Sequence, residues 1–540
     1  MRRLVLILMI GVLYSQEMDW RMFQRDNQRT GFTPYKGNFS DTLYSVKDSI
    51  YFYSLTPAPP LIGDFESDGN MEIVTKCTYY FQGNYRRGIV VNDAKTGEIK
   101  WRFPLPALSD RDGDIPVIED VNNDGIKEII TSWRPSPWCL RNANGMVFVI
   151  NTQTHDSLWV YKNDTLMFTS TAAGDVDGDG INEIVFSAVK YGADTIPSLF
   201  ILNGEDGSIY NIVDSFFVGN FSLYKKVPCS AYPVLCDLNN DGVYDILGVR
   251  YYSNTVFKLC AYDAKNKLFL WEKNFPAWRI AAADLDNNGI NEVITLTQRT
   301  LDSPETIYIR CLNGFNGDII WEKAMNSKER FPFPFAIGNI NSDMEKEIVF
   351  AQGDWQVTGG AVYTFNKDGQ ILWGKDPIDL FAVLDIDHVG EYHIAPHIVD
   401  INNDGEMEIL IEFAYACMIY SFNGNNGEYF LYKIPYVLPD TFPGGYVPLI
   451  TFGDADNDGY LEIIATVSDV LGWHKTQLFI LDETLEIKER IVLPERRKEK
   501  GFIYSVSGQR FLKEKIKKLP SGIYFSPFEN KKYIILRREK

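Results

Sequence analysis

The chain has 540 residues, of which 45% are hydrophobic and 14% aromatic, and its formal net charge is −19. This composition excludes a disordered protein and is typical of a folded, β-rich one. The acidic balance argues against a nucleic acid as partner, because binding to phosphates requires a basic surface.

The first residues have the pattern of an export signal. Arg2 and Arg3 precede an apolar stretch from Leu4 to Leu13, and small and polar residues follow. This order is that of a secretory signal peptide, and the stretch is shorter than the roughly 18 apolar residues that a membrane-spanning helix needs. We therefore predict a signal peptide at residues 1–16, no transmembrane span, and a secreted or cell-surface location.

Two segments follow before the first repeat. The stretch WRMFQRDNQRTGFTPY, from Trp20 to Tyr35, is interpreted as a structural segment that packs ahead of the first repeat unit. The stretch SIYFYSL near Ile50 reads as a strand, and we expect it to pair with the last repeat unit and so hold the two ends of the array together.

Eight acidic loops recur along the chain at intervals of 47 to 62 residues, which indicates repeated supersecondary units. The loop DVDGDGINEIVF begins at Asp175 and carries Asp177 and Asp179 at alternate positions. Gly180 follows, and Glu183 comes three residues later. A chain that bends at the glycine directs several oxygens at one centre, as calcium requires. An EF-hand instead places its bidentate glutamate at position twelve and continues as a helix.

Each loop lies between an apolar strand and a β-branched strand, and a hairpin follows that often ends in a tryptophan. Such hairpins end at Trp101, Trp271, Trp321 and Trp373, and Asn-Gly, Asp-Gly or Thr-Gly pairs favour their turns. Four strands per unit without a long helix predict an all-β protein, a β-propeller of about eight four-stranded blades, with seven as the alternative. The propeller would span residues 17–494, with the tryptophans packing neighbouring blades together.

The loop pattern D-x-[DN]-x-[DN]-G-x-x-[DE], followed by Ile or Val, resembles the FG-GAP or VCBS repeat. This is the calcium-loop blade of integrin α-subunit propellers and of many secreted bacterial proteins. The resemblance implies that side chains at loop positions one, three, five and nine bind Ca²⁺, with a backbone carbonyl at position seven, and that up to about seven ions are bound. The implied ligands are Asp64, Glu66, Asp68 and Glu72; Asp120, Asn122, Asp124 and Glu128; Asp175, Asp177, Asp179 and Glu183; Asp237, Asn239, Asp241 and Asp245; Asp284, Asp286, Asn288 and Glu292; Asp400, Asn402, Asp404 and Glu408; and Asp454, Asp456, Asp458 and Glu462.

One such loop alone would more often be a plain turn than a metal site, and the recurrence at matching phase is what favours calcium. The sixth loop, NINSDMEKEIV, departs from the pattern because Asn339 replaces the first aspartate and Met344 replaces the glycine. We expect this blade to keep its fold and to bind metal weakly or not at all.

The end of the chain differs in charge and forms a separate module at residues 495–540. It carries fourteen Lys and Arg against five Glu and reads as short strands joined by turns. It resembles the C-terminal sorting domain of the type IX secretion system, which implies export through an outer-membrane machinery. An ordinary small β-appendage is the alternative. The matching residues are Tyr504, Gly508, Leu519, Pro520, Gly522 and Tyr524.

Catalytic signatures are scarce. His388, His393 and His397 fall together before the seventh loop, but they lack a standard metal-ligand spacing and are interpreted as structural. Cys229 and Cys236 are close enough for a disulfide, yet scattered cysteines in strand-like runs are better read as buried thiols. Neither a nucleophile elbow nor a phosphate-binding glycine loop occurs.

We therefore assign no catalytic residue and no organic cofactor. The function predicted is a secreted or cell-surface calcium-binding propeller that acts as a binding or adhesion module for an extracellular protein or a glycan. The ligand would be met on one face of the ring or in its central channel. The alternative is a carbohydrate-active or quinoprotein-like enzyme on a propeller scaffold, because fold does not determine function.

Overall fold

The computed structural model describes residues 19–39, 45–53 and most of 59–482, together with four strands between residues 502 and 535. Within these limits it leaves out residues 23, 82–83, 107–114, 134–144, 191–196, 219–220, 223–226, 229–231, 254–255, 278, 298–305, 327–329, 342, 355–359, 379–394, 414–417, 434–445 and 470–474, and in the last part 506–509, 513–521 and 527–530. Contacts divide the chain into two units, Met1–Thr484 and Leu485–Lys540. The predicted signal peptide lies outside the described residues.

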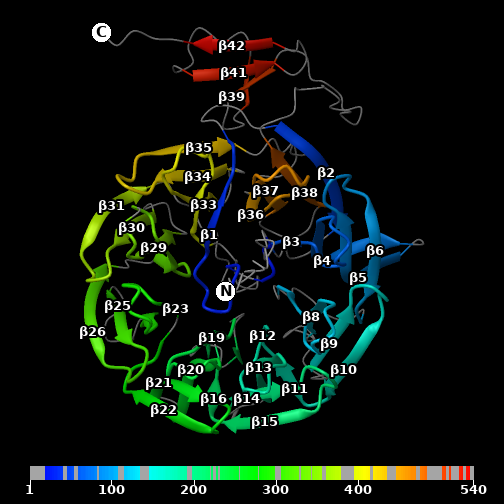
Figure 1. Cartoon of the computed structure of the whole chain (residues 1–540). Helices are drawn as coiled ribbons and strands as arrows, with labels where there is room; N and C mark the ends of the chain where they lie inside the picture. Colours follow the sequence, from blue (N-terminus) through cyan, green and yellow to red (C-terminus); the bar gives the residue numbers. More distant parts are fainter. Residues whose placement is uncertain are drawn as a thin grey trace, which may run out of the picture. The chain divides into compact units, whose positions relative to one another are not determined.

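The first unit is a ring of eight four-stranded antiparallel sheets, the blades, and the described residues include no helix (Figure 1). The prediction of an all-β propeller is confirmed, and the blade number is eight. From the axis outward, blade 1 contains β3 (Leu61–Gly63), β4 (Glu72–Phe81), β5 (Asn84–Asp93) and β6 (Ile99–Pro104); blade 2 contains β7 (Val117–Glu119), β8 (Glu128–Trp133), β9 (Gly145–Asn151) and β10 (Ser157–Asn163); blade 3 contains β12 (Ala172–Gly174), β13 (Glu183–Lys190), β14 (Pro197–Leu202) and β15 (Ile209–Asp214); and blade 4 contains β19 (Val234–Cys236), β20 (Asp245–Ser253), β21 (Val256–Asp263) and β22 (Leu268–Lys273).

The second half of the ring repeats this order. Blade 5 contains β23 (Arg279–Ala283), β24 (Glu292–Leu296), β25 (Thr306–Asn313) and β26 (Ile319–Asn326); blade 6 contains β28 (Ala336–Gly338), β29 (Glu347–Asp354), β30 (Gly360–Phe365) and β31 (Ile371–Ile378); blade 7 contains β32 (His397–Asp400), β33 (Glu408–Phe413), β34 (Met418–Asn423) and β35 (Tyr429–Lys433); and blade 8 contains β36 (Tyr446–Gly453), β37 (Glu462–Asp469), β38 (Lys475–Asp482) and β2 (Ser45–Tyr53). Short strands β11 (Leu166–Phe168), β16 (Phe216–Phe217) and β27 (Arg330–Pro332) add to blades 3, 4 and 6, and β17 (Phe221–Ser222) pairs with β18 (Val227–Pro228).

Burial explains the sequence of each strand. All residues of β8 and β24, the second strands of blades 2 and 5, are buried, and apart from Ser132 and the ninth-position acids Glu128 and Glu292 these strands are apolar or β-branched. The outermost strand β10 instead alternates between exposed and half-buried positions. The core is therefore formed between neighbouring blades. The part of the chain that the structure describes contains no helix long and apolar enough to cross a bilayer.

Tryptophans in the outermost strands of blades 2, 4, 5 and 6 join each of these blades to the next one. The indole N–H of Trp271 in blade 4 donates to the carbonyl of Gly314 in blade 5 at 2.7 Å. Trp321 and Trp373 reach the following blades in the same way, through Lys367 and Gly424. A Cβ at Gly317 would lie 2.6 Å from the ring of Trp271, which explains the glycine in that hairpin tip. The predicted role of these three tryptophans in blade packing is confirmed.

The ring closes through the N-terminal strand β2. It pairs antiparallel with β38 from Ser45 opposite Asp482 to Tyr53 opposite Lys475, and so supplies the outermost strand of blade 8. The expectation that this segment pairs with the last repeat unit is confirmed. Because the first and last strands share one sheet, separation of the ends requires the loss of a complete set of ladder hydrogen bonds.

Residues 19–39, which we call the axial segment, lie at the centre of the ring (Figure 1). They contact all eight blades. In six blades the inner-strand residue two positions before the start of the acidic loop donates its backbone N–H to a carbonyl of this segment. The pairs are Ile62 to Trp20, Ile118 to Arg21, Leu235 to Asn27, Ala282 to Gln28, Ile337 to Thr30 and Ile398 to Gly31, at 2.7 to 3.2 Å.

The axial segment contacts the two remaining blades, 3 and 8, through other hydrogen bonds. The side-chain amide of Asn27 donates to the carbonyl of Ala173 in blade 3 at 2.8 Å, and the N–H of Leu461 in blade 8 donates to the carbonyl of Lys36 at 2.8 Å. Strand β1 (Phe32–Lys36) also adds to β32 of blade 7 in a parallel arrangement. The interpretation of this segment as structural stands, but its expected place ahead of blade 1 is wrong, because it satisfies the inner sheet edges around the axis.

The second unit is a four-stranded antiparallel sheet in the order β40-β39-β41-β42. Its strands are β39 (Phe502–Ser505), β40 (Arg510–Leu512), β41 (Gly522–Ser526) and β42 (Lys531–Ile535). Of the residues that resemble a sorting domain, Tyr504 lies in β39 and Tyr524 in β41, and the two are neighbours across the β39–β41 pairing. Gly508, Leu519 and Pro520 lie outside the described residues.

The axial segment predicts an unusual mutational sensitivity. Trp20 belongs to no blade, yet it is 3% exposed and its ring packs 5.3 Å from Phe452 of blade 8 and 5.4 Å from His397 of blade 7. We expect Trp20→Ala to lower the free energy of unfolding by about 3–5 kcal/mol, the usual cost of removing a buried aromatic ring. Chemical denaturation measures this, and Phe315→Ala, at a 58% exposed hairpin tip, is the control. A similar small loss in both variants would contradict the central role of the segment.

Candidate metal centres

The eight acidic loops all lie at the same face of the ring. Each loop joins the inner strand of a blade to its second strand, as between β3 and β4. Because the four strands of a blade alternate in direction, these loops share one face with the hairpins between the third and fourth strands, such as the one between β5 and β6. The opposite face carries the turns between the second and third strands and the connections from one blade to the next.

Six loops share one hydrogen-bond scheme around the first aspartate, and in the third loop the N–H of Gly178 replaces that of Asp179 as a donor to Asp175. In the second loop, the N–H groups of Asp124 and Gly125 donate to the two oxygens of Asp120 at 3.2 and 2.9 Å. The N–H of Ile126 donates to Asp124 at 2.8 Å. The sixth-position glycines of the seven loops have φ between 82° and 92°, a region that side-chain-bearing residues seldom adopt. The glycine therefore lets position five turn back toward position one.

The ninth-position acid is buried in every blade. One oxygen of Glu183, which is 1% exposed, accepts the N–H of Val176 at 3.0 Å, and the corresponding bond occurs in all eight loops. Burial, reinforced by neighbouring carboxylates, raises the pKa of Glu183 to about 8 and that of Glu128 to about 7. The pKa of Asp245 rises to about 7 for the same reasons. These loops therefore hold carboxylates that ionise reluctantly in the absence of a cation.

Convergence of carboxylates is direct in four loops. One oxygen from each of three acids lies within 4.8 Å of the others, in the sets Glu66, Asp68 and Glu72; Asp175, Asp177 and Glu183; Asp284, Asp286 and Glu292; and Asp454, Asp456 and Glu462. The second, fourth and seventh loops carry an asparagine at position three, which offers a neutral amide oxygen in place of a carboxylate. Hard oxygen donors around a tight turn fit Ca²⁺, and its ligands in each loop would be the side chains at positions one, three, five and nine.

The sixth loop keeps the backbone path without the glycine. Met344 takes the place of the glycine with a φ of 77°, which lies in the left-handed region. Its side chain is 74% exposed, so packing of that side chain does not explain this backbone conformation. Glu347 still accepts the N–H of Ile340 at 2.8 Å, and β28 still pairs with β29. The expectation that this blade keeps its fold is confirmed. Weak or absent metal binding here stays a prediction.

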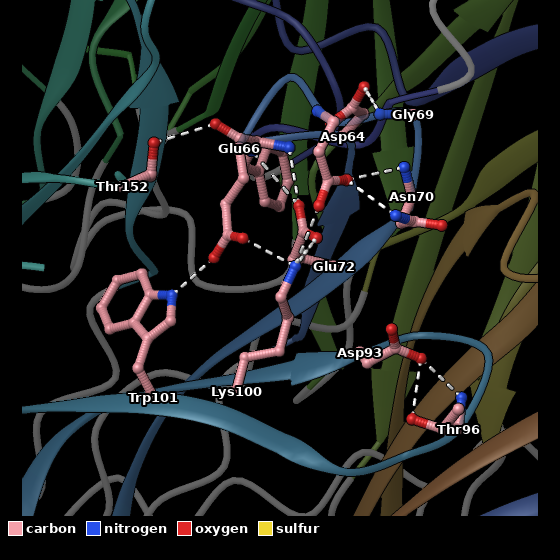
Figure 2. A network of polar contacts seen from close by, with 12 residues as sticks. Asp64, Glu66, Gly69, Asn70, Glu72, Asp93, Thr96, Lys100, Trp101 and Thr152 are labelled. Atoms are coloured by element: carbon pink, nitrogen blue, oxygen red, sulfur yellow. Dashed lines mark hydrogen bonds and ion pairs between the residues drawn. The ribbon is translucent and has the colours of Figure 1, made fainter. Parts of the chain in front are cut away.

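The first loop contains a cation of the chain itself. Figure 2 shows Lys100, from β6, directed at the loop. Its ammonium lies 2.7 Å from Glu66, 2.6 Å from Glu72 and 3.6 Å from Asp68. The indole N–H of Trp101 donates to the other oxygen of Glu66 at 2.8 Å. Burial alone would lower the pKa of Lys100, but the hydrogen bonds and charges of Glu66 and Glu72 raise it overall.

Lys100 is not among the residues that the loop pattern identifies. A signal for it exists, because the residue before the tryptophan of the hairpin is apolar in the blades of Trp159, Trp271, Trp321 and Trp373 and is charged only before Trp101. Trp101 also stacks on His155 of blade 2 with ring centroids 4.6 Å apart. Its N–H stays within its own blade, unlike those of the other four tryptophans.

Of the three histidines before the seventh loop, the structure describes His397 alone, so it does not show whether they lie together. His397 is buried in β32 against Trp20, and its Nε2 lies 3.5 Å from Glu412. His388 and His393 lie outside the described residues. Cys236 is a buried free thiol, as are Cys77, Cys260 and Cys311; Cys229 also lies outside the described residues.

No family model matches the chain, and no curated protein matches it. Among solved structures, the quinohemoprotein alcohol dehydrogenase of Comamonas testosteroni is similar with a TM-score of 0.53 and 10% identity, over 89% of this chain and 83% of that one. The quinohemoprotein alcohol dehydrogenase ADHIIG from Pseudomonas putida HK5 is similar with a TM-score of 0.51 and 10% identity, over 89% of this chain and 82% of that one. Rhamnogalacturonan lyase YesW has a TM-score of 0.49 and 12% identity, over 85% of this chain and 77% of that one. At these identities the likeness to the two dehydrogenases establishes a common fold and nothing about activity.

The buried acids predict how the metal-free protein responds to pH. The unfolded chain ionises its glutamates near pH 4.5, whereas burial holds the folded pKa of Glu183 near 8. A rise in pH between these two values therefore lowers the free energy of unfolding, because the unfolded chain releases its proton more readily. We expect the Tm of protein freed of metal by dialysis to fall as pH rises from about 5 to about 8.

A neutral isostere separates this effect from others. Glu183→Gln keeps the shape of the side chain and cannot ionise, so it should raise the Tm of metal-free protein at pH 8 relative to the wild type and change it little at pH 5. Scanning calorimetry across this range measures both variants. A wild-type Tm that stays level or increases toward pH 8 would show that the buried acids do not destabilise the empty loops.

Proposed function

We propose that the protein is a secreted or cell-surface β-propeller of the FG-GAP or VCBS type, stabilised by calcium, that binds an extracellular protein or glycan. The observation that carries this proposal is the repeated loop geometry. Acidic and amide oxygens meet at one face of at least seven blades around a buried ninth-position acid. A divalent ion in each loop would offset the repulsion among its carboxylates and stabilise the folded ring.

The centre of the ring is a poor place for a ligand of this chain. The axial segment bonds to all eight blades, and Trp20 and Arg29 within it are 3% and 2% exposed. The central channel proposed as one alternative is therefore filled by the chain itself. We infer that ligands bind on a face of the ring.

Differences between the blades favour the face opposite the acidic loops. The acidic loops have nearly the same length, and seven of them keep an aspartate as the acceptor at position one, whereas the turns between second and third strands range from residues 82–83 in blade 1 to 134–144 in blade 2. The connections between blades vary likewise, from 274–278 to 379–396. In repeat proteins, insertions of varied length on one face commonly form the binding surface. We assign the acidic face to calcium and the opposite face to the ligand.

Glycan and extracellular-protein arrays test the binding function. The purified protein should bind a ligand with Ca²⁺ present, lose most of that binding after chelation because the blades loosen, and release no product. A short Gly-Ser insertion between the end of β20 at Ser253 and the start of β21 at Val256, where these strands of blade 4 reach the proposed ligand face, should weaken binding more than the same insertion after Asn266, beyond the other end of β21. Product formation on any array substrate would favour the enzyme alternative, and equal effects of the two insertions would contradict the assignment of the face.

We further propose that residues 1–16 direct export and that residues 495–540 act as a sorting signal of the type IX kind, which pairs with outer-membrane secretion machinery. The opposite charges of the two parts support this separation, since the last 46 residues carry fourteen basic and five acidic side chains in an otherwise acidic chain. In a host with that secretion system, removal of residues 495–540 should retain the propeller inside the outer membrane. Immunoblots of cell fractions measure this, and unchanged release would refute the sorting role.

A further inference from the structure

Two residues that touch one another distinguish the first acidic loop and its hairpin from those of the other blades. Position three is Glu66, where the other loops have aspartate or asparagine. Lys100 precedes the hairpin tryptophan, where Leu158, Leu270, Ile320 and Leu372 stand in other blades. The departures occur together in one blade, which indicates that they form one arrangement.

The ammonium of Lys100 is bonded to the oxygens that a metal ion in this loop would need (Figure 2). One oxygen of Glu72 accepts the N–H of Phe65 at 2.9 Å, and the other accepts from Lys100 at 2.6 Å. Both oxygens of Glu66 are occupied as well, one by Lys100 at 2.7 Å and one by Trp101 at 2.8 Å. Calcium would have to bind the same carboxylates at 2.3–2.6 Å while the ammonium remained beside it.

Burial and charge favour the lysine over the ion. The side chain of Lys100 is 23% exposed, and the carboxylate of Glu72 is fully buried. A charged group paired inside a protein is costly to leave without its partner, so displacement of Lys100 by a metal would carry that cost. The longer Glu66 side chain reaches the ammonium and the indole together, and Thr152 of blade 2 donates to the carbonyl of Phe65 at 2.9 Å. The loop is thereby built into the contact between blades 1 and 2.

We propose that the first loop binds no calcium and is held instead by the ammonium of Lys100, which acts as a built-in cation, so that blade 1 is the one acid-rich loop of the seven whose stability does not depend on the ion. This inference rests on the proposed calcium function of the other loops. It removes Asp64, Glu66, Asp68 and Glu72 from the calcium ligands that the loop pattern implies.

Counting Ca²⁺ per chain by elemental analysis after equilibrium dialysis tests the inference in the full-length protein. Asp64→Asn should leave the number of bound ions unchanged, whereas Asp284→Asn in the fifth loop should lose one. Lys100→Met should gain one ion, because the freed carboxylates then resemble those of the other loops. Lys273→Met is the matched control, since Lys273 is 24% exposed and pairs with Asp318, which lies outside the acidic loops.

The outcomes separate the two proposals. Loss of an ion in Asp64→Asn, or an equal count in Lys100→Met and the wild type, would overturn the inference. A wild-type protein that binds no ion would overturn the calcium function, and a single ion gained by Lys100→Met in that case would still uphold the role of the lysine. If Lys100→Met does not fold, the comparison of Asp64→Asn with Asp284→Asn decides the question in the wild-type background.

Discussion

The inner edge of every blade is the constraint on which the ring depends. A sheet that ends at a central axis leaves backbone N–H and C=O groups without sheet partners, and such groups are costly to bury unpaired. Here the chain supplies a partner for them from its own N-terminal residues. Six inner strands donate the N–H of the residue two positions before the acidic loop, such as Ile62 or Leu235, to carbonyls of the axial segment. Each blade is thus anchored to a common centre as well as to its two neighbours.

Electrostatics at one face is the second constraint. The ninth-position acids are buried because the blade needs an acceptor for the N–H at position two, so each loop carries a carboxylate whose charge is poorly solvated. The chain compensates that charge in different ways. Blade 1 uses Lys100, the sixth loop reduces its charge through Asn339 and Asn341, and the remaining loops gather acids that suit a divalent ion. The blades therefore share a backbone and differ in the source of positive charge.

Local patterns carried most of what the sequence could predict. The repeat spacing, the glycine at position six and the hairpin tryptophans are short-range signals, and they predicted the blades, the loop geometry and the contacts of Trp271, Trp321 and Trp373. The axial position of Trp20 and Asn27 has no local signal, because it depends on partners that are dispersed from residue 62 to residue 461. Lys100 was missed for a related reason, since its 28-residue separation from Glu72 hides the contact.

The contacts of the axial segment with all eight blades impose an order of events on folding during synthesis. The axial segment touches blade 8, which leaves the ribosome last, and β2 finds its partner only when β38 has been made. Folding must therefore wait for a nearly complete polypeptide, as expected for a topology dominated by distant contacts. Asp19 is only 7% exposed in the finished ring. Its carboxylate pairs with Lys127 of blade 2 at 2.7 Å, so the start of the axial segment becomes enclosed only as the blades assemble around it.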